Sequence, residues 1–217
     1  MDMHAILTIV VTVLIIVFLI GMFKEARFHK KKKALHKEVI NTYGEPAKSL
    51  YISTKVFSLH QDTDITDEND NVIYHSKTKF WTLHDRTEIT NANGVFVSKM
   101  HSKLFSFHER RYITMANGVE FQLSNELWHI IKDITDIEGL DWKLEGNILG
   151  LNFTIKDDEG HILAYVGQKV LSMHDMYSID IYDVSKEAEI VTIVIGLQHM
   201  MRDRAVASSS ASSSSSN

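Results

Sequence analysis

The sequence predicts a mainly β domain, a closed antiparallel barrel around an apolar C-terminal helix, preceded by one N-terminal transmembrane helix. Three observations predict this architecture: an uncharged apolar run near the N-terminus, a threefold repeat of strand-like segments, and a second apolar segment after the repeats. Of the 217 residues, 44% are hydrophobic and 24% charged, which is typical of globular proteins and excludes wholesale disorder. Cysteine is absent, which excludes disulfides, thiolate metal sites and a cysteine nucleophile.

The first predicted element is a transmembrane helix over residues 5–23, after a short N-terminal flank at 1–4. The run carries no charge, and at ~1.5 Å per residue its helix is roughly 28 Å long, close to the hydrocarbon thickness of a bilayer. A cleaved signal peptide needs a basic start and a small-residue cleavage site, and neither is present. A helix buried in a protein core normally has a polar face, which this run lacks. We therefore predict a membrane anchor.

The second predicted element is a basic juxtamembrane linker over residues 24–48. Residues 24–37 contain seven Lys or Arg and one Glu, a net charge of +6 that leaves −11 for the rest of the chain. Positive charges beside a span stay on the cytoplasmic side. We therefore predict a single-pass protein of the cell membrane, with its N-terminus outside and its C-terminal domain in the cytoplasm.

The basic residues of this linker also predict a partner. A topology signal alone explains most of the run, but lysines close to a membrane surface attract anionic lipid as well. A basic footprint over the whole protein is absent, so nucleic acid is not a predicted partner. The candidates for lipid contact are Lys24, Arg27, Lys30, Lys31, Lys32 and Lys33.

A 24-residue repeat organises the domain that we predict over residues 49–204. The hexapeptide Lys-Val-Phe-Ser-Leu-His at 55–60 recurs in similar form at 79–84 and 103–108, and a degenerate copy covers 155–182. Three units in perfect spacing indicate a structural repeat. The aligned positions that follow the hexapeptides are Ile65, Ile89 and Ile113, then Thr66, Thr90 and Thr114, then Asn69, Asn93 and Asn117.

The repeat units read as antiparallel strands. Phe57 and Leu59 alternate with polar neighbours, as do Trp142 and Leu144. Alternation with a period of two indicates a strand with one buried and one exposed face. The Asn-Gly pair at 93–94 recurs 24 residues later and predicts hairpin turns, because both residues tolerate positive φ. The units therefore predict an antiparallel meander.

The last predicted element is a helix over residues 187–204, whose acidic start and basic end suit the helix dipole. Residues 190–197 are apolar on every side, so the helix either spans a membrane or is fully buried. The stretch 190–201 is too short to span, and it includes Gln198 and His199. A strand is the alternative, because β-branched residues are frequent here. We predict a helix inside the sheet, since a closed barrel must be filled.

The repeats and two further segments resemble the LURP-one-related family. The two segments are Ile-Glu-Gly-Leu-Asp-Trp-Lys-Leu-Glu-Gly at 137–146 and Tyr-Ser-Ile-Asp-Ile-Tyr-Asp at 177–183. The resemblance covers about residues 50–204, and the family is similar to the tubby C-terminal and phospholipid scramblase domains. It implies a barrel of about 12 strands around a central hydrophobic helix, and it supplies no catalytic residues. The serine-rich tail at 205–217 is predicted to be disordered.

Two groups of residues are candidates for metal binding. Four histidines share one repeat position, but their copies lie on different strands, whereas zinc ligands converge within ~2.1 Å of one ion. We therefore interpret His60, His84, His108 and His174 as repeated solvent-facing residues. The carboxylates ahead of the apolar helix resemble the calcium-responsive acidic segment of scramblases, and oxygen ligands suit Ca²⁺. This candidate calcium site comprises Asp180, Asp183, Glu187 and Glu189.

Local enzyme motifs are missing from the sequence. It contains no phosphate-binding P-loop, no Gly-x-Gly-x-x-Gly, no His-Glu-x-x-His and no Gly-x-Ser-x-Gly. A barrel filled by its own helix leaves no internal ligand cavity, so function would lie on the outer face or the rims. We predict a non-enzymatic, membrane-anchored module that binds lipid head groups or a protein partner and needs no cofactor. The alternative is a scramblase-like lipid-translocating protein or a hydrolase.

Overall fold

The computed structural model divides the chain into two compact units, Met1–Gly44 and Glu45–Asn217. In the first unit, residues 37–43 are helical, and the helix ends where the Gly44 N–H donates to the Ile40 carbonyl at 2.8 Å. Gly44 has a φ of +81°, which is usual for the glycine after a helix. The structure describes residues 11, 12, 15, 37–53, 62–79, 86–102, 110–124, 134–148, 150–169 and 176–213, with side chains of the last helix described to Asp203.

Several sequence predictions fall on the remaining residues. Apart from residues 11, 12 and 15, the predicted anchor at 5–23 lies outside the described part of the chain. Within the described ranges, no helix combines the length and the apolar character that a membrane span requires. The candidate lipid contacts and the repeated histidines also lie outside: Lys24, Arg27, Lys30, Lys31, Lys32, Lys33, His60, His84, His108 and His174.

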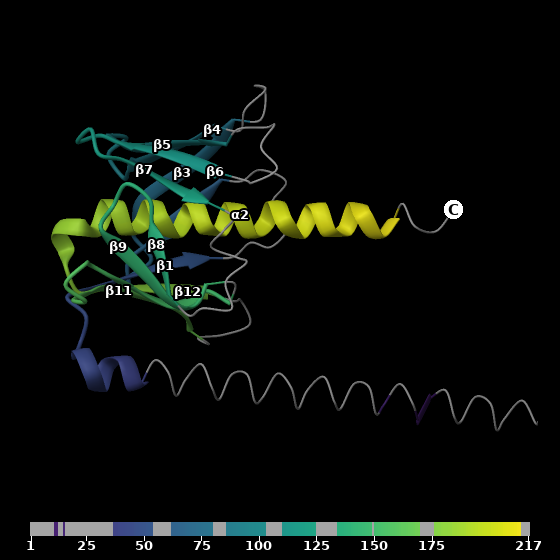
Figure 1. The fold of residues 1–217 in the computed structure, drawn as a ribbon, viewed down its shortest axis with the longest axis horizontal. Coiled ribbons are helices and arrows are strands. Elements are labelled where there is room, and N and C mark those ends of the chain that lie inside the picture. Colours follow the sequence, from purple (N-terminus) through teal and green to yellow (C-terminus); the bar gives the residue numbers. More distant parts are fainter. Residues whose placement is uncertain are drawn as a thin grey trace, which may run out of the picture. The chain divides into compact units, whose positions relative to one another are not determined.

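The second unit is a 12-stranded antiparallel sheet that curls into a nearly closed barrel (Figure 1). Its strand order is β7-β6-β5-β4-β3-β2-β1-β12-β11-β10-β9-β8, so β1 pairs with β12 and the two edge strands are β7 and β8. The mainly β antiparallel architecture is therefore confirmed. The strands are β1 (Lys48–Ser53), β2 (Thr63–Thr66), β3 (Val72–Lys79), β4 (Arg86–Asn91), β5 (Phe96–Ser102), β6 (Arg110–Met115), β7 (Glu120–Ser124), β8 (Ile134–Ile137), β9 (Trp142–Asn147), β10 (Asn152–Lys156), β11 (Ile162–Lys169) and β12 (Met176–Ile181).

Each repeat unit contributes one β-hairpin to this barrel. Ile65 of β2, Ile89 of β4 and Ile113 of β6 all point inward and are at most 2% exposed. Ile155 of β10 is completely buried at the matching position of the degenerate copy. The repeat therefore places an isoleucine at the same inward position of four hairpins.

The hairpin turns are of a different type from the one that the Asn-Gly pair predicts. Between β4 and β5, the Asn91 N–H donates to the Val95 carbonyl and the Gly94 N–H donates to the Asn91 carbonyl, both at 2.9 Å. Positive φ occurs at Gly94 but not at Asn93, so this is a type I turn followed by one left-handed residue. The left-handed residues of the matching turns are Asp70, Gly118 and Gly160.

The barrel is filled by α2 (Glu187–Ser213), which follows the short helix η2 (Val184–Lys186) and passes between the strands (Figure 1). The apolar side chains of α2 from Ile190 to Leu197 are 0% exposed. At Gly196, an added Cβ would lie 2.6 Å from Leu123 Cδ1, so the glycine allows β7 to approach the helix closely. The prediction of a buried helix is confirmed, and the strand alternative was wrong.

The helix extends further than the sequence suggests. We predicted its end at residue 204 and disorder from 205 on, whereas α2 continues to Ser213. The added segment contains alanines, which have the highest helix propensity, and serines, which a helix that has already started tolerates.

Candidate functional site

The four carboxylates of the candidate calcium site lie around the start of α2, with Asp180 in β12, Asp183 at the start of η2, and Glu187 and Glu189 in the first turn of α2. Asp180 in β12 is 1% exposed and accepts a hydrogen bond from Ser49 Oγ at 2.6 Å. Asp183 caps η2, where its carboxylate accepts from the Ser185 N–H at 2.9 Å. Asp183 therefore holds the local backbone, whereas Asp180 joins β12 to a side chain of β1.

Glu187 and Glu189 connect the start of α2 to the barrel wall. Glu187 accepts hydrogen bonds from Lys48 Nζ at 2.7 and 2.9 Å and from the Tyr74 hydroxyl at 2.9 Å. Burial of Tyr74 and its hydrogen bond to Glu187 hold the pKa of Tyr74 above its ordinary value. Glu189 accepts from Asn117 Nδ2 at 3.1 Å. In the part of the chain that the structure describes, no three His, Asp or Glu side chains gather as ion ligands.

At the other end of the barrel, polar groups inside the sheet contact the last described turns of α2. Arg111 of β6 points inward, is 1% exposed and pairs with Asp203. His199 Nδ1 lies 3.3 Å from Thr87 Oγ1, while its Nε2 has no hydrogen-bond partner among the described residues. Burial, with help from Arg111 and Arg202, lowers the pKa of His199 to about 3, so the ring is neutral at pH 7.

These contacts explain how a helix that is apolar on all sides keeps one orientation. Apolar packing alone distinguishes poorly between rotations of such a helix, whereas each polar contact has a single matching partner on the wall. Arg111 is not among the candidate residues that the sequence predicts, although the sequence contains a signal for it. Arg111 follows Thr87 by one repeat length, so the third unit carries an arginine at an inward position where the second carries a threonine.

The barrel closes at a seam, where β7 meets the turn between β8 and β9 at residues 120–122 and 138–139. The Gln122 N–H donates to the Glu138 carbonyl at 2.9 Å, which is an isolated bridge and not a continuous ladder. Gly139 has a φ of +92°, and a Cβ on it would lie 2.8 Å from the Glu120 carbonyl oxygen and 2.9 Å from Phe121 Cα. Only glycine permits this close approach.

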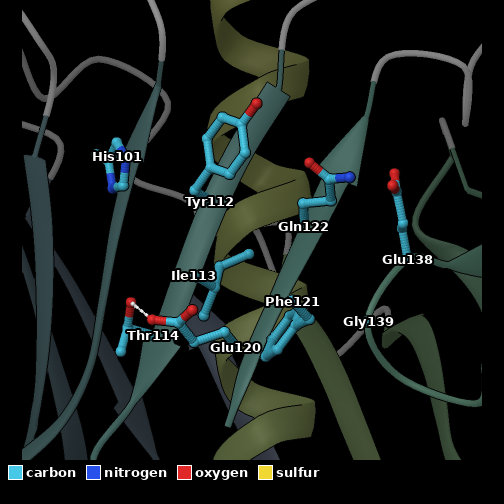
Figure 2. A pocket seen from close by; sticks show the side chains of 9 residues that line it. All are labelled: His101, Tyr112, Ile113, Thr114, Glu120, Phe121, Gln122, Glu138 and Gly139. Atoms are coloured by element: carbon cyan, nitrogen blue, oxygen red, sulfur yellow. Dashed lines mark hydrogen bonds between the residues drawn. The ribbon is translucent and has the colours of Figure 1, made fainter. Parts of the chain in front are cut away.

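A hollow of about 370 Å³ lies on the outer face at this seam (Figure 2), and we call it the seam hollow. Strand register places four of its side chains in a row, since His101 lies opposite Tyr112, Tyr112 opposite Gln122, and Gln122 opposite Glu138. The rings of His101 and Tyr112 are stacked, with centroids 5.4 Å apart. The seam hollow is lined by His101, Tyr112, Ile113, Thr114, Glu120, Phe121, Gln122, Glu138 and Gly139.

The lining of the seam hollow is acidic at the surface and apolar beneath it. Glu120 and Glu138 are exposed, and Glu120 accepts a hydrogen bond from Thr114 Oγ1 at 3.3 Å. Ile113 and Phe121 belong to the core and are 2% and 4% exposed. Among the nine lining residues there is no Lys or Arg.

The seam hollow is not predicted by the sequence. Its residues come from three separate strands and one turn, and their outward positions look like any exposed face of a strand. The available signal was the segment at 137–146, which resembles the LURP-one-related family and contains Glu138 and Gly139.

A comparison with known families assigns most of this chain to one family. A model of the family described as LURP-one-related matches residues 48–198, the range from the first strand to the apolar part of α2. A search of curated proteins found no match. Among solved structures, the X-ray structure of a protein from Arabidopsis thaliana is similar, with 15% identity, a TM-score of 0.45, and coverage of 72% of this chain and 95% of that chain. Because the family model matches well over half of the sequence, the chain belongs to the LURP-one-related family.

Proposed function

We propose that this chain is a non-enzymatic binding module, which presents the outer face of its barrel to a partner beside a membrane. The observation that supports this function is the filled interior. Apolar side chains of α2 such as Val194 and Ile195 are fully buried against the strands, so the described part of the barrel has no room for an internal substrate. Binding then falls to the outer face, where the seam hollow is a concave feature.

The place of the module at the membrane is part of the same proposal and is supported by the sequence. The uncharged run at 5–23 has the length of a transmembrane helix, and the +6 segment at 24–37 follows it directly. In this arrangement the barrel lies on the cytoplasmic side, and the linker lysines lie within reach of anionic lipid.

The charge of the barrel favours a protein partner over a lipid head group. Outside residues 24–37 the chain carries a net charge of −11, and the seam hollow contains two exposed carboxylates. An acidic surface repels the phosphates of lipid head groups, so the barrel itself suits a protein partner better.

Liposome flotation with residues 45–217, which lack the anchor and the basic segment, separates the two partners. We expect the same low recovery with neutral phosphatidylcholine vesicles and with vesicles that contain phosphatidylserine. Recovery with anionic vesicles alone would instead assign a lipid head group to the barrel. Translocation of a labelled lipid by the full chain in reconstituted vesicles would contradict the binding-module proposal and favour the scramblase-like alternative.

A further inference from the structure

The seam hollow has the size of a site for one side chain or one small head group. Its volume of about 370 Å³ lies near the lower end of the roughly 300–1,000 Å³ that is usual for ligand pockets. At this point β7 and the β8–β9 turn are joined by an isolated bridge and not by a continuous ladder. Figure 2 shows His101, Tyr112, Gln122 and Glu138 side by side across the sheet, with Thr114 and Glu120 below them.

The lining offers hydrogen-bond acceptors and negative charge. Glu120 projects from β7 and Glu138 from the opposite side of the seam, and Gln122 lies two residues from Glu120 on β7 and opposite Glu138 in the register. A carboxylate accepts hydrogen bonds and donates none, so two of them on opposite sides suit a group with several N–H donors and a positive charge.

The stacked ring pair selects further among cations. Tyr112 stands between His101 and Gln122 in Figure 2, and its ring is stacked with that of His101. The face of an aromatic ring attracts cations, most often the planar guanidinium of arginine. A trimethylammonium head group is also a cation, but it has no N–H to donate to Glu120 or Glu138. A phosphate group is excluded by repulsion from the same two carboxylates.

We propose that the seam hollow binds the basic side chain of a protein partner, arginine in preference to lysine. This assignment rests on the proposed function in its protein-binding form and names the chemistry of the partner. The guanidinium donates to Glu120 and Glu138 across the seam and stacks beside Tyr112.

Nuclear magnetic resonance of the full chain in a neutral maltoside detergent tests this assignment. The probes are Nα-acetyl-arginine methylamide, the citrulline analogue of the same shape without charge, and phosphocholine. We expect the arginine probe to cause saturable shifts of the amide signals of Tyr112, Gln122 and Gly139, and the citrulline probe to cause none. The double variant E120Q/E138Q is expected to bind the arginine probe about tenfold more weakly.

A matched control removes the same number of charges elsewhere. The variant E68Q/D158N neutralises two exposed carboxylates in hairpin turns that do not line the hollow, and it is expected to bind the arginine probe like the natural chain. If both double variants bind the arginine probe more weakly by the same factor, the net charge of the protein explains the binding, and the proposed site is wrong.

Three other results overturn the assignment without depending on those variants. These are equal shifts with citrulline, larger shifts of the same amides with phosphocholine, and no saturable shift with any probe. The comparison of arginine with citrulline on the natural chain remains decisive even if E120Q/E138Q does not fold. None of these results decides the broader binding-module proposal, because the flotation experiment tests that proposal separately.

Discussion

At Gly139 the turn after β8 comes so close to β7 that a methyl group has no room. A G139A substitution places Cβ within 3 Å of two backbone atoms and also forces alanine to a φ of +92°. We expect a loss of about 2–4 kcal/mol in the free energy of unfolding of residues 45–217, measured by chemical denaturation.

Gly94 is the matched control for this substitution. It has a φ of +76°, but an added Cβ meets no atom within 4 Å. The G94A variant should therefore lose only the backbone term of about 1 kcal/mol. Equal losses in the two variants would show that the seam does not depend on close packing at Gly139.

His199 makes the stability of the barrel sensitive to acid. Its folded pKa of about 3 is far below the ordinary value of 6.5, so below pH 6.5 the unfolded chain binds a proton that the folded chain does not. Stability therefore falls by about 1.4 kcal/mol per pH unit below 6.5 and levels off near pH 3. Between pH 7 and pH 5, which lies above the ordinary pKa values of carboxylates, we expect a loss of about 2 kcal/mol. The H199Q variant should lose much less over this interval in pH-dependent denaturation.

His161 serves as the control for that measurement. Its exposed ring lies 3.0 Å from an oxygen of Asp157, whose hydrogen bond and charge raise the pKa of His161. A raised pKa contributes stability that is complete below the ordinary value and is lost as the pH rises, which is the opposite sign. The H161Q variant should therefore retain the acid sensitivity. A flat profile in H161Q together with an unchanged one in H199Q would contradict the assignment.

Among the elements, α2 determines whether the domain folds at all. Val194 is 0% exposed, and an aspartate at this position buries a carboxylate without a partner. The cost of several kcal/mol is comparable to the ~5–15 kcal/mol total stability of a domain. We expect V194D to show no cooperative thermal transition by circular dichroism of residues 45–217.

The control for V194D is the same replacement of valine by aspartate at position 184. Val184 in η2 is 48% exposed, so V184D should melt cooperatively. Truncation after Lys186 should abolish folding as completely as V194D, because the apolar lining of the barrel would face water. A normal transition in residues 45–186 would refute the central role of the helix.

The elements also show which parts of the structure the sequence can predict. The inward positions of Trp142 and Leu144 and the buried character of α2 follow from local periodicity, and the equivalence of Ile65 and Ile89 follows from the repeat. The meeting of β7 with the β8–β9 turn does not, because closure depends on the twist and stagger of the entire sheet. The partners of the candidate calcium carboxylates were missed for the same reason, since Glu187 finds Lys48 only through the pairing of β1 with β12.

For the whole molecule, the segregation of charge predicts orientation in a membrane. Protease added to intact cells should leave residues 45–217 uncut, because we propose that the basic segment at 24–37 keeps them on the cytoplasmic side. Permeabilised cells are the control, in which the same protease should reach the domain and its linker. Immunoblotting against the C-terminal tail distinguishes the two cases, and cleavage in intact cells would reverse the orientation.

The position of α2 in the chain has a consequence for the synthesis of the protein. The helix that occupies the centre of the barrel leaves the ribosome after all 12 strands, and β12, the partner of β1, is the last strand to appear. At about 5–20 residues per second, the stretch from residue 48 to 197 takes roughly 8–30 s to translate. Throughout that time the inward strand faces have nothing of their own chain to cover them. We therefore expect the barrel to fold as one unit after translation, and the apolar strand faces of nascent chains to be prone to aggregation until then.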